Sequence, residues 1–435
     1  MRRAPILALM LAVAGCGLFD DSAPPLPGER IPIRQAAPER LAPPDVAQQV
    51  AALGPPTRNA DWAQRNAVPT RAPGHLTGPA GFSEAWRVDA GGGASGAARI
   101  TSGPVVSGGR VFTLDAASTV SAFDAASGAR LWRQSLTPEG ESARSGFGGG
   151  LAVAEGRVIA STGFGEALAL SVSDGSILWR RRLGAPSRAA PAVEGGLAVV
   201  VTRDDTAFGL DVASGDVRWR AVGTVGGAGV LGGASPAMGG GLAILPFASG
   251  ELVAVSAANG RRVWADALGG GRRSLARAAI ADVSGDPVIA GFGVFASSHS
   301  GVLVAIDARS GRRGWAREIG TTSPVWPVGA TLFLIDDTGR LMRLAAGTGE
   351  TLWVTELPAY RDPARRRGVI TYAGPVVASD RVWVTSSAGE LLAFNPATGE
   401  PLGSAPIPGG SITGPVVANG VLYVLSDRGT LHAFR

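Results

Sequence analysis

The nine residues "DAASGARLW", Asp124–Trp132, combine a turn-forming segment with the start of a short strand, and related segments recur along the chain. "DVASGDVRW" begins at Asp211, and "DARSGRRGW" begins at Asp307. Glycine accepts the positive φ that a tight turn needs, and an aspartate side chain can accept hydrogen bonds from amides of its own turn. A turn that returns at regular intervals indicates a repeated structural unit.

Tryptophans mark this repeat at intervals of about 40 to 50 residues, and between them each unit carries four short strand-like runs. In the first unit these runs are "GPVVSG", "RVFTLDA", "TVSAFDA" and "ARLWRQSL". Four short strands per unit are typical of a β-propeller blade. We interpret the tryptophans as packing between blades, not as ligand-stacking residues. They are Trp86, Trp132, Trp179, Trp219, Trp264, Trp315 and Trp353.

The two ends of the repeat region complement each other. The last unit, "GPVVANGVLYVLSDRGTLHAFR", has three strands and stops at Arg435, whereas "EAWRVDA" around Trp86 is a fourth strand without the preceding three. Pairing the two would leave no open sheet edge at the ring closure. The sequence therefore predicts an all-β, eight-bladed propeller over residues 82–435, closed by its N- and C-terminal strands. The seventh unit has Gly403 where a tryptophan is expected.

The N-terminus has the features of a secretory signal. Residues 1–15 combine two arginines with an apolar run that is short for a membrane span. The only cysteine, Cys16, follows Val13-Ala14-Gly15, and this tetrapeptide resembles a bacterial lipobox, in which the cysteine is lipidated. Because Gly17 stands where an inner-membrane retention signal has aspartate, the resemblance implies the outer membrane.

Residues 16–81 are rich in proline and alanine and lack a sustained strand pattern, so we predict a lipid-anchored tether. Trp62 is the exception within this stretch, because a large aromatic ring is costly to leave in water. We expect Trp62 to dock on the folded domain.

The pattern A-x-D-x-x-[ST]-G-x-x-x-W resembles the repeat of the pyrroloquinoline quinone (PQQ) propeller superfamily, which contains both dehydrogenases and non-enzymatic scaffolds. The resemblance implies that a dehydrogenase would need a vicinal disulfide, a calcium site with carboxylates and an aspartate base. A chain with one cysteine cannot form that disulfide, and His75, His299 and His432 lack metal-ligand spacing. We therefore predict no catalytic, metal or cofactor residues. A periplasmic PQQ-dependent, dehydrogenase-like quinoprotein is the alternative.

The lipobox, the tether and the eight-bladed propeller together resemble the family of outer membrane protein assembly factor BamB. The resemblance implies a non-enzymatic lipoprotein of the outer membrane that faces the periplasm. Such a protein is a monomer within the β-barrel assembly complex, binds the periplasmic domains of BamA and aids insertion of β-barrel proteins.

The resemblance also implies where a partner would bind. In the family, contact is concentrated in connections between blades on one face, including a leucine-containing loop that ends in arginine. In "RRRLGAPSRAAP" the matching residues are Arg188 and Leu183. The next connector, "GTVGGAGVLGGASP", lacks the acidic pair of the family, so we expect Val230 and Leu231 to make the contact there.

Arginine accounts for all 40 basic residues, and the net charge is +5. The arginines are too scattered for the basic stripe of a nucleic-acid-binding protein. Two connectors nevertheless concentrate them on the face where the partner is expected. Such a rim could contact an acidic partner or lipid headgroups, or it could simply be solvated surface. The arginines are Arg272, Arg273, Arg277, Arg361, Arg365, Arg366 and Arg367.

Overall fold

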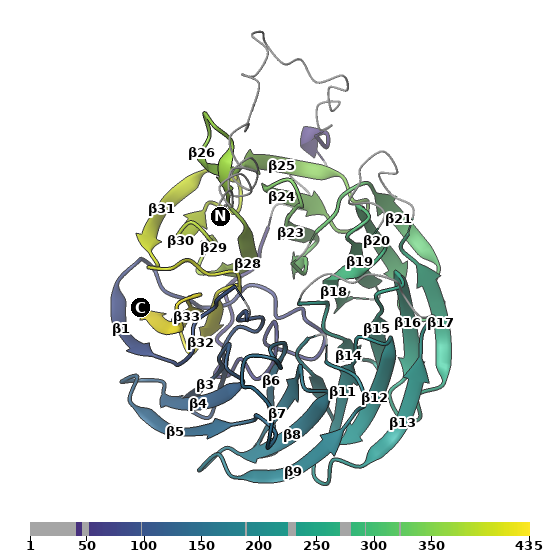
Figure 1. Cartoon of the computed structure of the whole chain (residues 1–435). Coiled ribbons are helices and arrows are strands. Elements are labelled where there is room, and N and C mark those ends of the chain that lie inside the picture. The colour runs from purple at the N-terminus through teal and green to yellow at the C-terminus, as the bar shows by residue number, and fades with distance from the viewer. Residues whose placement is uncertain are drawn as a thin grey trace, which may run out of the picture. The chain divides into compact units, whose positions relative to one another are not determined.

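The computed structural model describes residues 41–45, 52–96, 98–187, 189–224, 232–269, 280–291, 293–321 and 323–435. These residues form eight four-stranded antiparallel sheets and one two-stranded hairpin. The sheets follow one another around a central axis (Figure 1). The prediction of an all-β, eight-bladed propeller is therefore confirmed.

Blades are numbered 1 to 8 in chain order, and in blades 1 to 7 the chain runs from the innermost to the outermost strand. The innermost strands are β2 (Val105–Ser107), β6 (Gly149–Ala154), β10 (Ala192–Glu194), β14 (Ala237–Gly239), β18 (Val283–Ala290), β22 (Trp326–Val328), β28 (Tyr372–Ala378) and β32 (Val416–Ala418). The second strands are β3 (Arg110–Leu114), β7 (Arg157–Thr162), β11 (Leu197–Val201), β15 (Leu242–Pro246), β19 (Gly293–Ser298), β23 (Thr331–Ile335), β29 (Arg381–Ser386) and β33 (Val421–Leu425). The third strands are β4 (Thr119–Asp124), β8 (Glu166–Ser171), β12 (Thr206–Asp211), β16 (Glu251–Ser256), β20 (Val302–Asp307), β24 (Arg340–Ala345), β30 (Glu390–Phe394) and β34 (Thr430–Phe434). The outermost strands are β5 (Arg130–Ser135), β9 (Ile177–Arg182), β13 (Val217–Val222), β17 (Arg262–Ala267), β21 (Arg313–Arg317), β25 (Thr351–Glu356), β31 (Pro401–Pro406) and β1 (Glu84–Asp89). The hairpin consists of β26 (Tyr360–Asp362) and β27 (Arg367–Val369).

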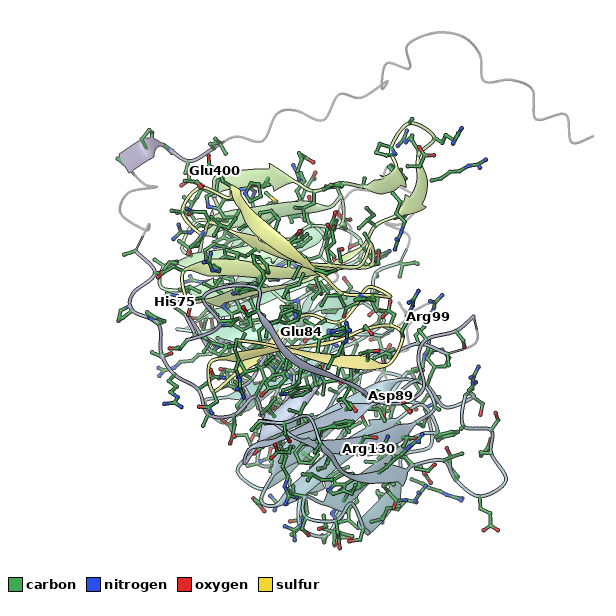
Figure 2. All side chains as sticks on the ribbon, turned by 90° about the vertical axis from the view of Figure 1, so that its left-hand side faces the viewer. His75, Glu84, Asp89, Arg99, Arg130 and Glu400 are labelled. Atoms are coloured by element: carbon green, nitrogen blue, oxygen red, sulfur yellow. The ribbon has the colours of Figure 1, made fainter. Side chains whose placement is uncertain are left out.

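Strand order defines two faces of the ring. The first-to-second and third-to-fourth strand turns lie on one face, which we call the turn face. The second-to-third turns and the connections between blades lie on the other, which we call the connector face. In the side view of Figure 2, His75 and Glu400 lie toward the turn face and Arg99 lies toward the connector face.

The ring closes as the sequence predicts. The outermost strand of blade 8 is β1, which pairs antiparallel with β34, so that Trp86 lies opposite Ala433. The side chains of Glu84 and His432 also meet, with 2.6 Å between Oε1 and Nδ1. Strands from both ends of the chain therefore complete one sheet.

The repeated tryptophan packs on the turn of the following blade. A Cβ added at Gly175 would lie 2.5 Å from the ring of Trp132, so only glycine lets the ring approach this closely. The corresponding turn glycines are Gly128 for Trp86, Gly215 for Trp179, Gly260 for Trp219, Gly311 for Trp264, Gly349 for Trp315 and Gly399 for Trp353. The tryptophan and the glycine thus join neighbouring blades.

Most of these indoles also donate a hydrogen bond to the next blade. The acceptors, at 2.8–3.0 Å, are the carbonyls of Val172 for Trp132, Val212 for Trp179, Ala257 for Trp219, Ala308 for Trp264, Ala346 for Trp315 and Pro396 for Trp353. Trp86 has no such bond among the described residues, and the equivalent carbonyl of Ala125 accepts the Tyr423 hydroxyl at 3.3 Å. The indole N–H is therefore hydrogen-bonded at six junctions, where the ring is buried or half-buried.

The junction between blades 7 and 8 explains why residue 403 is glycine. A tryptophan here would face blade 8, whose third and fourth strands come from opposite ends of the chain and are not joined by a turn. Phe82 fills the space instead, 3.1 Å from the position of a Cβ on Gly403 and edge-on to Trp383. The missing tryptophan therefore marks the closure of the ring.

The predicted tether over residues 16–81 is too long, because the compact unit extends well beyond residue 82 toward the N-terminus. Residues 57–78, which we call the inner loop, pack inside the ring. Trp62 is 2% exposed and stacks on Trp326, with 5.8 Å between ring centroids, so its predicted docking is confirmed. Arg71 is fully buried, and burial lowers its pKa to about 10.

The inner loop makes one circuit of the ring and hydrogen-bonds to all eight blades in their spatial order. Starting at blade 8, the contacts join Asn59 to Val417, Trp62 to Val106, Ala63 to Val153, Gln64 to Val193, Pro69 to Met238, Thr70 to Ile289, Gly74 to Trp326 and Leu76 to Val377. In each of these pairs the second residue lies on the innermost strand of its blade. The inner loop therefore fills the centre of the ring at its turn face.

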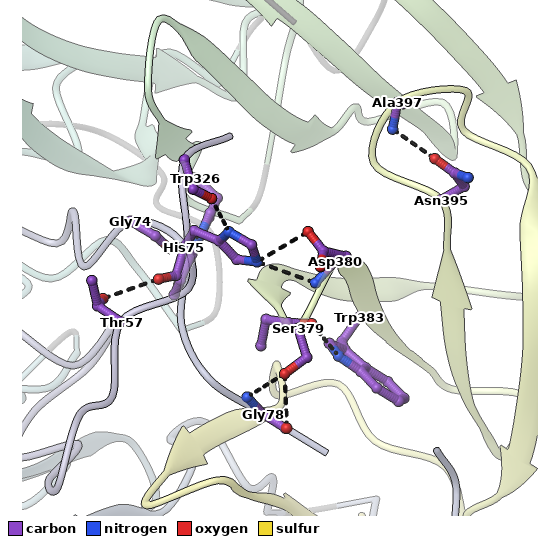
Figure 3. A network of polar contacts seen from close by, with 12 residues as sticks. Thr57, Gly74, His75, Gly78, Trp326, Ser379, Asp380, Trp383, Asn395 and Ala397 are labelled. Atoms are coloured by element: carbon purple, nitrogen blue, oxygen red, sulfur yellow. Dashed lines mark hydrogen bonds and ion pairs between the residues drawn. The ribbon is translucent and has the colours of Figure 1, made fainter. Parts of the chain in front are cut away.

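The circuit also closes on itself. Thr57 donates its amide to the carbonyl of His75 and accepts the amide of Thr77, both at 2.8 Å. The His75 ring accepts the amide of Asp380 at 3.1 Å, and Ser379 bonds to both the amide and the carbonyl of Gly78 (Figure 3). His75 thus fixes the inner loop to blade 7.

Candidate functional site

The connector face is the candidate functional surface, because the predicted partner residues lie in its loops. Of the predicted partner residues Leu183, Arg188, Val230 and Leu231, Leu183 is the one whose position the structure describes. It follows β9, is 7% exposed and donates its amide to Gly165 at 2.8 Å. The equivalent residues after other outermost strands are also buried: Leu136, Leu268, Ile319, Leu357 and Ile407. Leu183 is thus a repeated core residue, which corrects the prediction that its side chain contacts a partner.

The other predicted partner residues, Arg188, Val230 and Leu231, lie outside the described residues. So do the predicted lipidation site, Cys16, and the connector arginines Arg272, Arg273 and Arg277. Next to the Arg188 loop, the structure describes an arginine pair on β9. Arg180 contacts the buried carboxylate of Glu166 at 2.5 Å, and Arg182, 90% exposed, lies 3.8 Å from the same carboxylate. Strand alternation in "RRR" could have identified these two residues, because period-2 spacing puts both on one side of the strand.

A pocket of about 440 Å³ opens at the centre of the connector face. Its floor includes Trp62, Arg65 and Asn66 of the inner loop. Its walls include three Gly-Pro dipeptides. Gly103-Pro104 and Gly414-Pro415 directly precede β2 and β32, and Gly374-Pro375 lies within β28 at an irregularity of its pairing with β29. Since the inner loop fills the turn face, the pocket is a blind funnel and not a channel through the ring.

The charged side chains that line this pocket are positive. Its described lining includes Arg65 and Arg99 but no aspartate or glutamate. Arg65 contacts the buried carboxylate of Asp286 at 2.5 Å and keeps 23% of its side chain exposed. Burial, followed by the nearby Glu390 carboxylate, raises the pKa of Tyr372 to about 12, so this phenol stays neutral. The pocket suits an apolar group accompanied by negative charge.

The hairpin β26–β27 is an insertion between blades 6 and 7 that projects from the ring (Figures 1 and 2). Arg361 holds its base by donating to the carbonyls of Ser387 and Ala388 in blade 7. Arg366 lies over the Tyr360 ring, 5.5 Å from its centroid. The sequence located this arginine cluster but did not predict that it forms a separate hairpin.

The side chains of Asp336, His75 and His432 have structural contacts. Asp336 accepts the amides of Thr338 and Arg340 within its own turn. Within the described ranges, no group of three His, Cys, Asp or Glu residues could hold a metal ion. The pocket therefore does not fit a calcium-bound quinone, because its described lining supplies no carboxylate. The described part of the chain also contains no helix long and apolar enough to cross a membrane.

Comparison with known proteins gives consistent similarities. A family model described as outer membrane protein assembly factor BamB matches residues 82–144, 116–355 and 357–435. Outer membrane protein assembly factor BamB of Yersinia pestis is 24% identical over 339 residues, which cover 76% of this chain and 83% of that protein.

Two solved structures illustrate the range of proteins with this fold. BamB from Moraxella catarrhalis superimposes with a TM-score of 0.69 and 21% identity, covering 82% of this chain and all of that one. Quinohemoprotein alcohol dehydrogenase from Comamonas testosteroni gives a TM-score of 0.64 and 14% identity, covering 90% of this chain and 84% of that one. At these identities the superpositions show a shared fold alone.

Proposed function

Since the chain belongs to the family of outer membrane protein assembly factor BamB, we propose that it is a non-catalytic scaffold in the assembly of outer membrane proteins. The observation that carries this proposal is the filled centre of the ring. The inner loop occupies one end, and the pocket at the other end has no carboxylate among its described lining residues. A closed ring of this kind offers surfaces for binding partners.

The proposed location and partner follow from the family. Cys16 would carry the lipid that anchors the protein to the outer membrane, with the propeller in the periplasm. The partner would be the periplasmic domains of BamA, bound through the connector face within a hetero-complex. Arg188, Val230 and Leu231 are proposed contacts, and Arg182 joins them because it is exposed beside the same connector.

Affinity purification from membranes tests this proposal. The tagged full chain should co-isolate BamA, and Arg188→Glu should weaken that capture without changing the melting temperature. Arg309→Glu is a matched control, because Arg309 is an exposed arginine in a turn of the opposite face. Quinone-dependent dye reduction with an alcohol or a sugar would contradict the scaffold role and favour the dehydrogenase alternative.

A further inference from the structure

The β26–β27 hairpin and the central pocket are parts of one surface. The chain leaves β27 at Val369 and continues directly through Thr371 and Tyr372, which line the pocket. The hydroxyl of Tyr372 donates to the carbonyl of Pro358, at the other end of the hairpin, at 2.8 Å. Thr371 and Ser387 fix the same base through two hydrogen bonds of 2.9 Å. The base of the hairpin therefore borders the pocket, and its strands project away from the ring (Figures 1 and 2).

The charge of this combined surface is positive. The hairpin segment 360–369 contains four arginines and a single acid, Asp362, whose carboxylate already contacts Arg365 at 3.3 Å. Arg366 and Arg367 are exposed. Arg99 on the pocket rim lies near the carboxylate of Asp427, which accepts the Ile412 amide. Arginine guanidinium groups bind carboxylates through paired hydrogen bonds.

Apolar surface accompanies this charge. Val369 is 68% exposed on the hairpin, and Ile412 is 40% exposed on the pocket rim. The pocket volume of about 440 Å³ is within the range of about 300–1,000 Å³ that is typical of ligand pockets. A suitable occupant therefore brings an apolar side chain and neighbouring negative charges.

We propose that this surface binds an extended segment of a partner protein in which an apolar side chain is flanked by carboxylates. The apolar side chain occupies the pocket, and the carboxylates contact Arg366 and Arg367. A flat layer of lipid headgroups would reach the projecting hairpin but would not use the pocket. The inference rests on the proposed role as a protein-binding scaffold and adds the chemistry of one bound segment.

Fluorescence anisotropy with the full chain, purified in detergent, tests the proposal. The probe is a fluorescein-labelled peptide, acetyl-EELLGEE-amide, and its lysine counterpart, acetyl-KKLLGKK-amide, is the charge control. The acidic peptide should bind and the lysine peptide should not. Arg366→Glu with Arg367→Glu should weaken binding about tenfold or more, because two attractive contacts become repulsive.

Two further variants separate local effects from a general change in charge. Arg130→Glu with Arg309→Glu makes the same change in net charge at exposed positions on the turn face, and binding should be unchanged. Ile412→Asp adds a carboxylate to the pocket rim, and it should weaken binding of the acidic peptide. Unchanged melting temperatures for all variants would show that the ring is intact.

Three outcomes would overturn the inference. The acidic peptide could fail to bind, or it could bind the hairpin variant as tightly as the wild type. Alternatively, the protein could bind vesicles containing phosphatidylglycerol through the hairpin arginines and not bind the peptide. That result would identify a lipid-binding surface. If BamA still co-isolates with the chain in any of these cases, the proposed scaffold function stands and only this inference fails.

Discussion

Trp62→Ala tests whether the inner loop is a structural part of the ring. The indole is 2% exposed and stacks on Trp326 at 5.8 Å and 16°, whereas the two backbone hydrogen bonds of residue 62 to Val106 do not depend on the side chain. Truncating a buried tryptophan to alanine costs about 3–5 kcal/mol. About 0.5–1.5 kcal/mol of this belongs to the aromatic pair.

Because the lost contacts hold the inner loop against the innermost strands, part of the effect should appear as local opening. Trypsin cleavage after Arg71 reports that opening, since Arg71 is fully buried in the closed state. When opening and closing are faster than cleavage, the rate follows the population of the open state. A loss of about 3 kcal/mol then accelerates cleavage after Arg71 about a hundredfold.

Two measurements complete this test. The urea midpoint should fall in Trp62→Ala but not in Leu41→Ala, which truncates an exposed side chain outside the inner loop. The tryptic fragment ending at Arg71 should appear rapidly in the first variant alone. Cleavage within about threefold of the wild-type rate, together with an unchanged urea midpoint, would refute a structural role for the inner loop.

Gly175→Ala should lower the melting temperature well beyond Gly156→Ala: both glycines have positive φ, but only the Cβ at residue 175 would meet the indole of the preceding blade. Equal effects would mean that backbone strain alone matters. Hydrogen bonding by Arg218 lowers the pKa of Asp211 to about 2. The stability that the Asp211 carboxylate contributes is therefore fully present above the unfolded pKa of about 3.9 and is lost as the pH falls toward 2. Between pH 4 and 2 the urea midpoint should therefore drop less in Asp211→Asn than in the wild type. Cys16→Ala should move the protein from the membrane to the soluble fraction, and unchanged fractionation would exclude the lipid anchor.

The repeat was predictable because its determinants are local in the sequence. The turn glycine and the tryptophan of one unit lie four residues apart, so the blades could be counted without knowing any contact. The same reasoning paired the strand at Trp86 with the C-terminal strand, and the structure confirms it. Gly403 was noticed as an exception, but its reason required the junction with blade 8, where Phe82 replaces the missing ring.

The inner loop could not be predicted in this way. Its contacts join residues far apart in the sequence, as with Trp62 and Trp326, and they leave no period in the chain. Proline-rich composition is typical of a tether, yet prolines also suit a segment that must run past eight strands without forming a sheet of its own. The error at Leu183 was different, because leucine recurs directly after several outermost strands, as at Leu136 and Leu268. That local signal identifies a core position.

The segment before β1 compensates for the weakest point of the ring. Seven junctions have a tryptophan on a turn glycine, but the junction between blades 7 and 8 lacks both groups, because blade 8 is assembled from the two chain ends. Phe82 packs there from the outer side, and Asn59 bonds to the innermost strand of blade 8 while Leu76 bonds to that of blade 7. One continuous segment thus secures both the inner and the outer ends of the closure. Separating blades 7 and 8 would therefore require release of the inner loop, which is hydrogen-bonded to the innermost strands of both.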